Sequence, residues 1–147
     1  MKLQISSQLA IFALLELAAH PERQFSVAEI GEKYGVSHHH LAKVMHSLGR
    51  AGLVRSVRGV GGGYQFSGSV RRTTLLDIVE VFEALGSSDG DRGVGKSTGA
   101  GRALRQVLNE IDEIARATLG SITIGTMLKL VDRQRKGAPS ARPERAA

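Results

Sequence analysis

The sequence contains no cysteine. Disulfide bonds and thiolate-bound metals are therefore excluded, because both need a cysteine sulfur. The chain also lacks an apolar run of the roughly 20 residues that a membrane-spanning helix requires. The apolar N-terminal stretch resembles a signal peptide, but Ser6, Ser7, Gln8 and Glu16 interrupt it, and its apolar residues recur at helical spacing. We therefore predict that it is the first helix of a cytoplasmic protein that has no membrane partner.

Acidic residues are missing from one long stretch of the chain. None occurs between Glu32 and Asp77, although this stretch carries seven lysines and arginines and four of the five histidines. The formal net charge is +6, and residues 1–72 supply most of it, with nine basic and four acidic side chains. A basic segment without acids is typical of a surface that binds a polyanion, so we predict a nucleic-acid partner.

The sequence shows neither paired carboxylates nor a nucleophile and base at catalytic spacing. We therefore expect that the protein is not an enzyme. One motif points elsewhere, since Gly90–Ser97 (GDRGVGKS) matches the phosphate-loop pattern G-x-x-x-x-G-K-[ST]. A working phosphate loop needs a strand before it and a helix after it. The preceding apolar residues recur at helical spacing and predict a helix that ends at Gly86. We interpret residues 87–100 as a flexible glycine-rich loop, and a small nucleotide-binding protein remains the alternative.

The first half of the chain predicts three helices. The first covers residues 6–19, and the second covers residues 27–34, with Ser26 and Glu29 as a capping box. The third starts at Ser37 and runs to about residue 50, with an apolar face and a polar face that carries His39, Lys43, His46 and Arg50. Two short helices joined by a tight turn predict a helix-turn-helix.

Alternating residues from Leu53 to Phe66 predict a β-hairpin, or wing, directly after these helices. Gly61, Gly62 and Gly63 lie in its turn, where glycine permits positive φ and a close approach of the backbone to a phosphate. Arg55 and Arg58 lie on the approach to this turn. We therefore expect the hairpin and the third helix to form one basic surface.

Beyond the glycine-rich loop, residues 101–117 predict a longer helix. Its apolar stripe is too long for one small domain to cover, so we expect a second copy to cover it in a two-fold dimer. Another amphipathic segment, residues 121–135, can pack beside it. The expected fold is mainly α with a small β-hairpin. Its expected parts are a winged helix-turn-helix (1–86), the loop (87–100), dimerisation helices (101–134) and a disordered tail (135–147).

The segment YGVSHHHLAKVMHSLGRAGLVRSVRGVGGGYQF, followed by TTLLDIVEVFEAL, resembles the Rrf-two type (IscR/NsrR-like) winged helix-turn-helix transcriptional regulators. The resemblance implies a homodimer that binds duplex DNA and usually represses. Its recognition-helix positions map onto His38, His39, His40 and Lys43, and its wing positions onto Arg58 and residues 61–63. With the helix cap and the neighbouring arginines, the expected DNA contacts are Ser37, His38, His39, His40, Lys43, Arg50, Arg55, Arg58, Gly61, Gly62 and Gly63.

The resemblance also implies an iron–sulfur cluster on three cysteines in the loop before the long helix. This chain has none, so we expect no such cluster and no other cofactor. An alternative use of His38, His39, His40 and His46 is a transition-metal site, although adjacent histidines on a helix point in different directions. A regulator that senses a small molecule between the wing domain and the long helix is a further alternative, but no sequence signature identifies the effector.

Overall fold

The computed structural model describes residues 1–85 and 94–137. In this part of the chain, six helices surround or extend from one core, and the two strands form an antiparallel hairpin. The expected fold class, mainly helical with a winged helix-turn-helix, is confirmed. The elements are α1 (Ile5–Ala19), α2 (Val27–Tyr34), α3 (His38–Arg50), β1 (Val54–Val57), β2 (Gly63–Phe66), α4 (Leu75–Phe82), α5 (Gly99–Ser121) and α6 (Ile124–Gly137).

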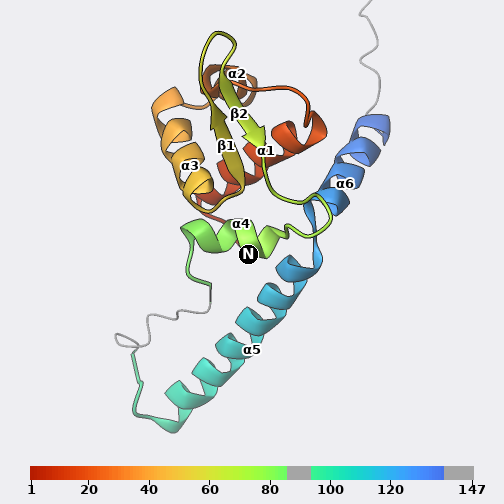
Figure 1. Cartoon of the computed structure of the whole chain (residues 1–147). Helices are drawn as coiled ribbons and strands as arrows, with labels where there is room; N and C mark the ends of the chain where they lie inside the picture. Colours follow the sequence, from red (N-terminus) through yellow and green to blue (C-terminus); the bar gives the residue numbers. More distant parts are fainter. Residues whose placement is uncertain (86–93, 138–147) are drawn as a thin grey trace, which may run out of the picture.

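Helix α1 is the centre of the compact part of the molecule. It contacts α3, α4, α6 and β2, and nine of its fifteen residues are buried. The sequence predicts one apolar face, but α1 is buried on most sides. Ile5 and Phe12 are exposed apolar exceptions, and the half-exposed ring of Phe12 stacks on Tyr34 of α2 at 5.1 Å between centroids. Figure 1 shows α3 and α6 on opposite sides of α1.

Local capping signals set the starts of α2 and α4. The capping box predicted at Ser26 and Glu29 is present, and a second capping box joins Thr74 and Asp77. In each, the hydroxyl accepts from the backbone N–H three residues later, and the carboxylate accepts from the cap residue's N–H. These reciprocal bonds satisfy donors that a helix terminus otherwise leaves unpaired.

Helix α4 ends earlier than the sequence predicts. Its last helical residue is Phe82 rather than a residue next to Gly86, and Gly86 lies outside the described residues. Glu83 is already extended, with φ −131° and ψ 136°. Its carboxylate is engaged by the N-terminus of α1, where it accepts from the N–H of Gln4 at 3.0 Å. The helix therefore ends at the point where the next side chain meets the N-terminus of α1.

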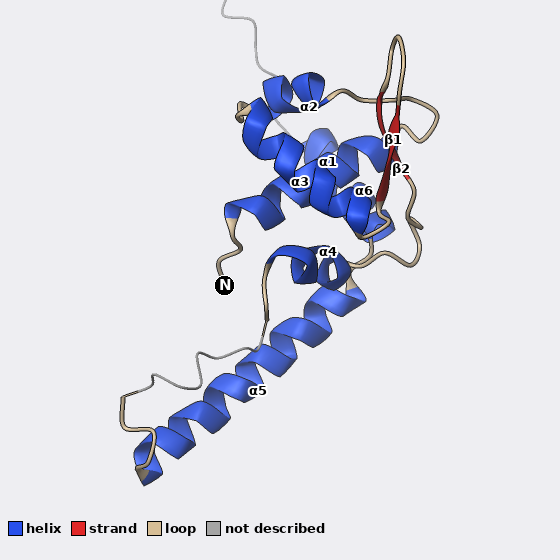
Figure 2. Ribbon diagram, turned by 60° about the vertical axis from the view of Figure 1, so that its left-hand side comes forward, coloured by secondary structure: helices blue, strands red, loops and turns tan. Residues whose placement is uncertain are grey.

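Helix α5 projects away from the compact part of the molecule in both views (Figures 1 and 2). It has 23 residues, more than the 17 predicted, and begins two residues earlier because Thr98 caps it by accepting from the N–H of Gly101 at 3.0 Å. At about 1.5 Å per residue it is about 35 Å long. Helix α6 continues to Gly137, so residues 135–137 of the expected tail are helical, and the remainder of that tail lies outside the described residues.

Candidate DNA interface

Helix α3 separates its side chains into a buried face and an exposed face. Leu41, Val44, Met45 and Leu48 are buried against the core. His39, Lys43, His46 and Arg50 are all exposed, as their spacing predicts. The helix has no acidic residue in its first turn, and Ser37 caps it by accepting from the N–H of His40 at 3.4 Å. The positive end of the helix dipole therefore adds to the basic side chains on this face.

The three adjacent histidines at the start of α3 point to different surroundings. The ring of His38 lies against Gly31 of α2, where an added Cβ would come within 2.9 Å of its Cδ2. The ring of His40 is half-buried, and its Nε2 lies 3.1 Å from the Ser6 hydroxyl of α1. His39 is exposed on the outer face of α3, so it is the histidine best placed to meet a ligand.

Metal binding by these histidines finds no support in the arrangement. Across residues 1–85 and 94–137, no three His, Cys, Asp or Glu side chains gather closely enough to hold a metal ion. The divergence of His38 and His40 toward α2 and α1 accounts for this, because a chelating site needs side chains that converge.

The hairpin pairs Val54 with Phe66 at its base and Val57 with Gly63 near its tip. Arg55 lies on the exposed surface, where its guanidinium donates two hydrogen bonds to Gln65 Oε1 across the strands, at 2.8 and 3.1 Å. This contact joins the Arg55 side chain to the neighbouring strand. Arg58 follows β1 directly and is exposed on the turn.

The glycines of the turn have different structural causes. Gly61 adopts a positive φ of 74°, which favours glycine. Gly63 has no positive φ, but an added Cβ would lie 2.4 Å from the carbonyl oxygen of Phe25. Gly62 is crowded in the same way by the carbonyl of Val57, at 2.5 Å. Packing within the protein therefore accounts for Gly62 and Gly63, and their expected role at DNA stays a prediction.

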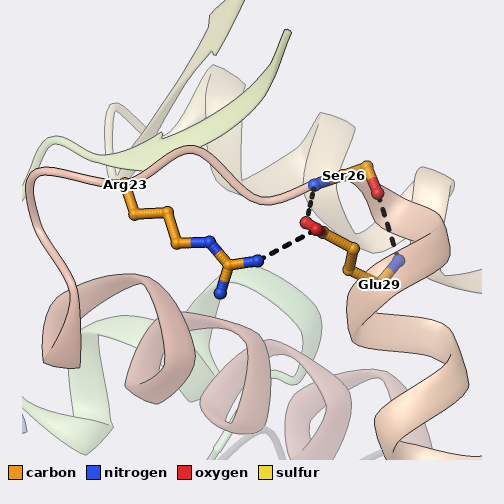
Figure 3. Close-up of polar contacts among 3 residues, drawn as sticks. All are labelled: Arg23, Ser26 and Glu29. Carbon is orange, nitrogen blue, oxygen red and sulfur yellow. Dashed lines mark hydrogen bonds and ion pairs between the residues drawn. The ribbon is translucent and has the colours of Figure 1, made fainter. Parts of the chain in front are cut away.

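The wing is fastened to the helix-turn-helix through the segment between α1 and α2. Phe25 pairs with Tyr64 of β2 through two backbone hydrogen bonds of 3.0 and 2.8 Å. Figure 3 shows the contacts beside this pair: Glu29 accepts from the N–H of Ser26 at 2.9 Å and from the guanidinium of Arg23 at 3.0 Å. The guanidinium also lies over the Phe25 ring, 4.4 Å from its centroid. These contacts fix the hairpin relative to α2.

Two features of the basic surface are not among the DNA contacts expected from the sequence. Val60, at the tip of the hairpin, is fully exposed, and its position between two turn glycines is the signal that could have identified it. Arg71 and Arg72 belong to the acid-free stretch, but they lie in a turn packed against the start of α6, where the N–H of Gly125 donates to Val70 O at 2.9 Å. The acid-free stretch therefore supplies two separate basic areas.

The phosphate-loop match lacks the strand that its chemistry requires. The element before it is helix α4, and the strands of the described residues both belong to the hairpin. Residues 90–93 of the motif lie outside the described residues. The later part forms a turn in which Thr98 N–H donates to Gly95 O at 2.9 Å, and Thr98 caps α5. The nucleotide-binding alternative is not supported.

A cavity of about 350 Å³ lies between the end of α4 and α5, lined by Leu85, Asn109, Asp112, Glu113 and Arg116. Arg116 crosses this region, forming an ion pair with Glu80 at 2.7 Å and donating to the carbonyl of Leu85 at 2.9 Å. The cavity lies between the wing domain and helix α5, the region in which a small-molecule effector is an alternative prediction.

A capped second helix, a basic and acid-free third helix and a basic hairpin define a DNA-binding regulator of the winged helix-turn-helix class. Residues 3–130 match the family Rrf2, described as an iron-dependent transcriptional regulator. The chain belongs to the Rrf2 family, as the sequence resemblance implies.

Similar proteins agree with this assignment. BadM of Rhodopseudomonas palustris is 48% identical over 92% of this chain and 86% of its own length. The HTH-type transcriptional regulator IscR of Xenorhabdus nematophila is 31% identical over 98% of this chain and 94% of its own. Among solved structures, CymR, the global cysteine regulator of B. subtilis, has a TM-score of 0.75 with 25% identity, covering 88% of this chain and 98% of its own. IscR of T. potens has a TM-score of 0.66 with 32% identity, over 95% and 93%.

The residues of this chain do not fit a cluster held by cysteine thiolates. The family description includes iron, but the sequence supplies no cysteine sulfur, and the described residues bring together no alternative set of three ligands. No helix in the described ranges is long and apolar enough to cross a membrane.

Proposed function

We propose that this regulator is a homodimeric repressor. Each subunit binds one of two half-sites, related by two-fold symmetry, in duplex DNA through α3 and the β1–β2 hairpin. The observation that carries the proposal is the exposed face of α3, which presents four basic or titratable side chains and no acid. In a helix-turn-helix, the N-terminal part of the second helix contacts base edges in the major groove.

The positions of the side chains suggest different tasks. Lys43 and His39 are exposed in the first two turns of α3, so we assign them to base edges. Arg50 lies at the far end of the same helix, and Arg55 and Arg58 lie on the hairpin, so we assign all three to phosphates or to the minor groove. The ring contacts of His38 and His40 with protein neighbours favour a supporting role for them.

The first experiment selects bound sequences from random duplexes with the wild-type protein and measures affinity for the selected duplex and a scrambled one. Arg58→Ala removes one phosphate contact per subunit, so it is expected to weaken both and to lower the salt slope by about one per subunit. Lys43→Ala is expected to reduce discrimination between them by about 1–3 kcal/mol. Lys129→Ala, on α6, is the charge-matched control. Wild-type protein that selects no sequence contradicts the proposal.

The exposed stripe of α5 supports the homodimer. Leu104, Val107, Leu108, Ile111 and Ile114 are between 48% and 66% exposed, although they follow one face of the helix. A contiguous apolar face of this kind marks an interaction surface, and two-fold pairing of identical faces is the commonest way to cover one.

Repression follows from occupancy, because a dimer bound across two successive major grooves excludes other proteins from that duplex. Transcription in vitro from a promoter that contains the selected site is expected to fall as the protein is added. A rise in transcript would contradict repression without contradicting DNA binding. A small-molecule effector stays a prediction, and the cavity beside Arg116 is its candidate location.

A further inference from the structure

The N-terminus of α1 receives its cap from another part of the chain. Gln4, the residue before the helix, makes no side-chain capping bond, and the first turn contains no acidic residue. The carboxylate of Glu83, 79 residues away, takes this role. One of its oxygens, Oε2, accepts from the backbone N–H of Gln4 at 3.0 Å and from the hydroxyl of the fully buried Ser7. A carboxylate at a helix N-terminus is stabilised by the unpaired N–H groups there.

Helix α5 contacts the chain on both sides of Glu83, before it and after it. Arg116 of α5 pairs with Glu80, three residues before Glu83, at 2.7 Å. The same guanidinium donates to the backbone carbonyl of Leu85, two residues after Glu83, at 2.9 Å. A displacement of α5 relative to α4 would therefore move the backbone on both sides of Glu83.

The first turn of α1 also holds the first turn of α3. Ser6, next to Ser7, places its hydroxyl 3.1 Å from Nε2 of His40. The backbone N–H of His40 donates to Ser37, the cap of α3. His40 thus connects Ser37, the cap of the recognition helix α3, to α1. Both contacts lie at the N-terminal end of α3, which the proposed function places against the bases.

We propose that Glu83 and Ser6 are positioning residues that transmit the placement of α5 to the recognition helix α3. The connected groups are Arg116, Glu80 and Leu85 between α5 and α4, then Glu83 with Gln4 and Ser7, and finally Ser6 with His40. The inference rests on the proposed function of α3 as the DNA reader. These contacts connect the α4–α5 region to the surface of α3 that binds DNA.

The route has a specific consequence for DNA binding. Base-edge hydrogen bonds depend on the placement of α3 within a fraction of an ångström, whereas phosphate contacts from long arginine side chains adapt to small shifts. Loss of the Ser6–His40 contact should therefore reduce sequence discrimination and leave non-specific binding nearly unchanged. A phosphate-contacting residue would show the opposite pattern.

The test measures the ratio of affinities for the selected and scrambled duplexes in Ser6→Ala, Glu83→Gln and the double variant. Loss of one hydrogen bond predicts about a fivefold lower ratio for Ser6→Ala and a similar or smaller loss for Glu83→Gln. The double variant is expected to lose little more than Ser6→Ala, because contacts on one route are not additive. Ser6→Thr keeps the hydroxyl and should restore the ratio. Asp132→Asn on α6 is the control for the charge change in Glu83→Gln.

A second measurement needs no DNA. The NMR signals of the His40 ring are expected to shift in Glu83→Gln and Arg116→Gln, whereas those of the exposed His39 ring stay in place. Unmoved His40 signals, or additive losses in the double variant, would overturn the proposal. Equal weakening on both duplexes with a lowered Tm would also overturn it, in favour of a purely structural role. A moved His40 signal with no sequence discrimination in the wild type would instead overturn the proposed function and leave the contact route supported.

Discussion

Helices α1 and α5 both carry apolar residues at helical spacing, but these residues differ in how far they are buried. In α1 most such residues are buried, with Leu14 and Leu17 fully inaccessible. In α5 only Leu119 is buried, and Ile114 is 66% exposed. Helical periodicity therefore predicts that a face needs cover, but it does not say whether the same chain provides that cover.

The difference follows from position rather than composition. Helix α1 lies between three other helices and a strand, whereas α5 contacts the compact part mainly through α4 near its C-terminal end. A helix of about 35 Å extends beyond a core of this size. We infer that the two apolar faces serve two equilibria, the folding of one chain and the pairing of two chains.

The largest expected effect comes from truncating matched leucines in the two regions. Leu41→Ala, at a fully buried position of α3, is expected to lower the free energy of unfolding by about 2–5 kcal/mol. Leu108→Ala, at a position 48% exposed in α5, is expected to lower it by less than about 0.5 kcal/mol at protein concentrations where the chain is monomeric. Urea unfolding at low concentration measures both. Equal losses would mean that α5 belongs to the same core.

The second prediction concerns the pairing equilibrium. Ile111→Glu places a charge in the centre of the exposed stripe, and burial of an unpaired charge is expected to raise the dimer dissociation constant by about 100-fold or more. Sedimentation equilibrium measures this constant. Gln106→Glu adds the same charge on the opposite side of α5 and should leave it nearly unchanged. If both variants dimerise like the wild type, another surface joins the subunits.

Local signals account for most of what the sequence predicts correctly. Ser26 with Glu29 and Thr74 with Asp77 lie three residues apart, so their capping boxes are visible in the sequence. The spacing of Leu41, Val44, Met45 and Leu48 likewise defines the buried face of α3. These features depend on neighbours within one or two helical turns, which is why pattern and propensity suffice to find them.

The features that the sequence misses depend on distant residues. Helix α4 ends at Phe82, and the carboxylate of the next residue, Glu83, is bound by Gln4 and Ser7, which are nearly 80 residues away. His40 was expected at DNA, but its ring is engaged by Ser6, 34 residues away. No local rule predicts which side chain meets which across a core, so these assignments required the structure.

Helix caps provide a smaller effect that sharpens the comparison. Ser26→Ala removes a cap inside the compact part and is expected to lower the free energy of unfolding by about 1 kcal/mol. Thr98→Ala removes the cap of α5, whose first turns are mostly exposed, so it should fray that end with little change in global stability. Urea unfolding reports the first effect, and amide hydrogen exchange in residues 99–102 reports the second. A global loss of similar size from Thr98→Ala would contradict the separation.

The smallest expected effect is a pH dependence confined to the compact part. Burial alone would raise the pKa of the Glu16 carboxyl, but hydrogen bonds from Lys33 and Tyr34 and the charge of Lys33 outweigh it and lower this pKa below 4.5. A lowered carboxyl pKa means that the folded state favours the ionised form. This contribution to stability is present above pH 4.5 and is lost as the pH falls through the lowered pKa.

Glu16→Gln should therefore flatten the loss of stability as the pH is lowered from about 5 to 3, compared with the wild type. Glu113→Gln, at an exposed position of α5, should leave that loss unchanged. Urea midpoints across this pH range measure both. If Glu113→Gln flattened the acid response as much as Glu16→Gln, then α5 would be electrostatically part of the folding unit. The separation of folding from pairing would then fail, because a charge on the exposed part of α5, away from its contact with α4, should not affect the stability of the single chain.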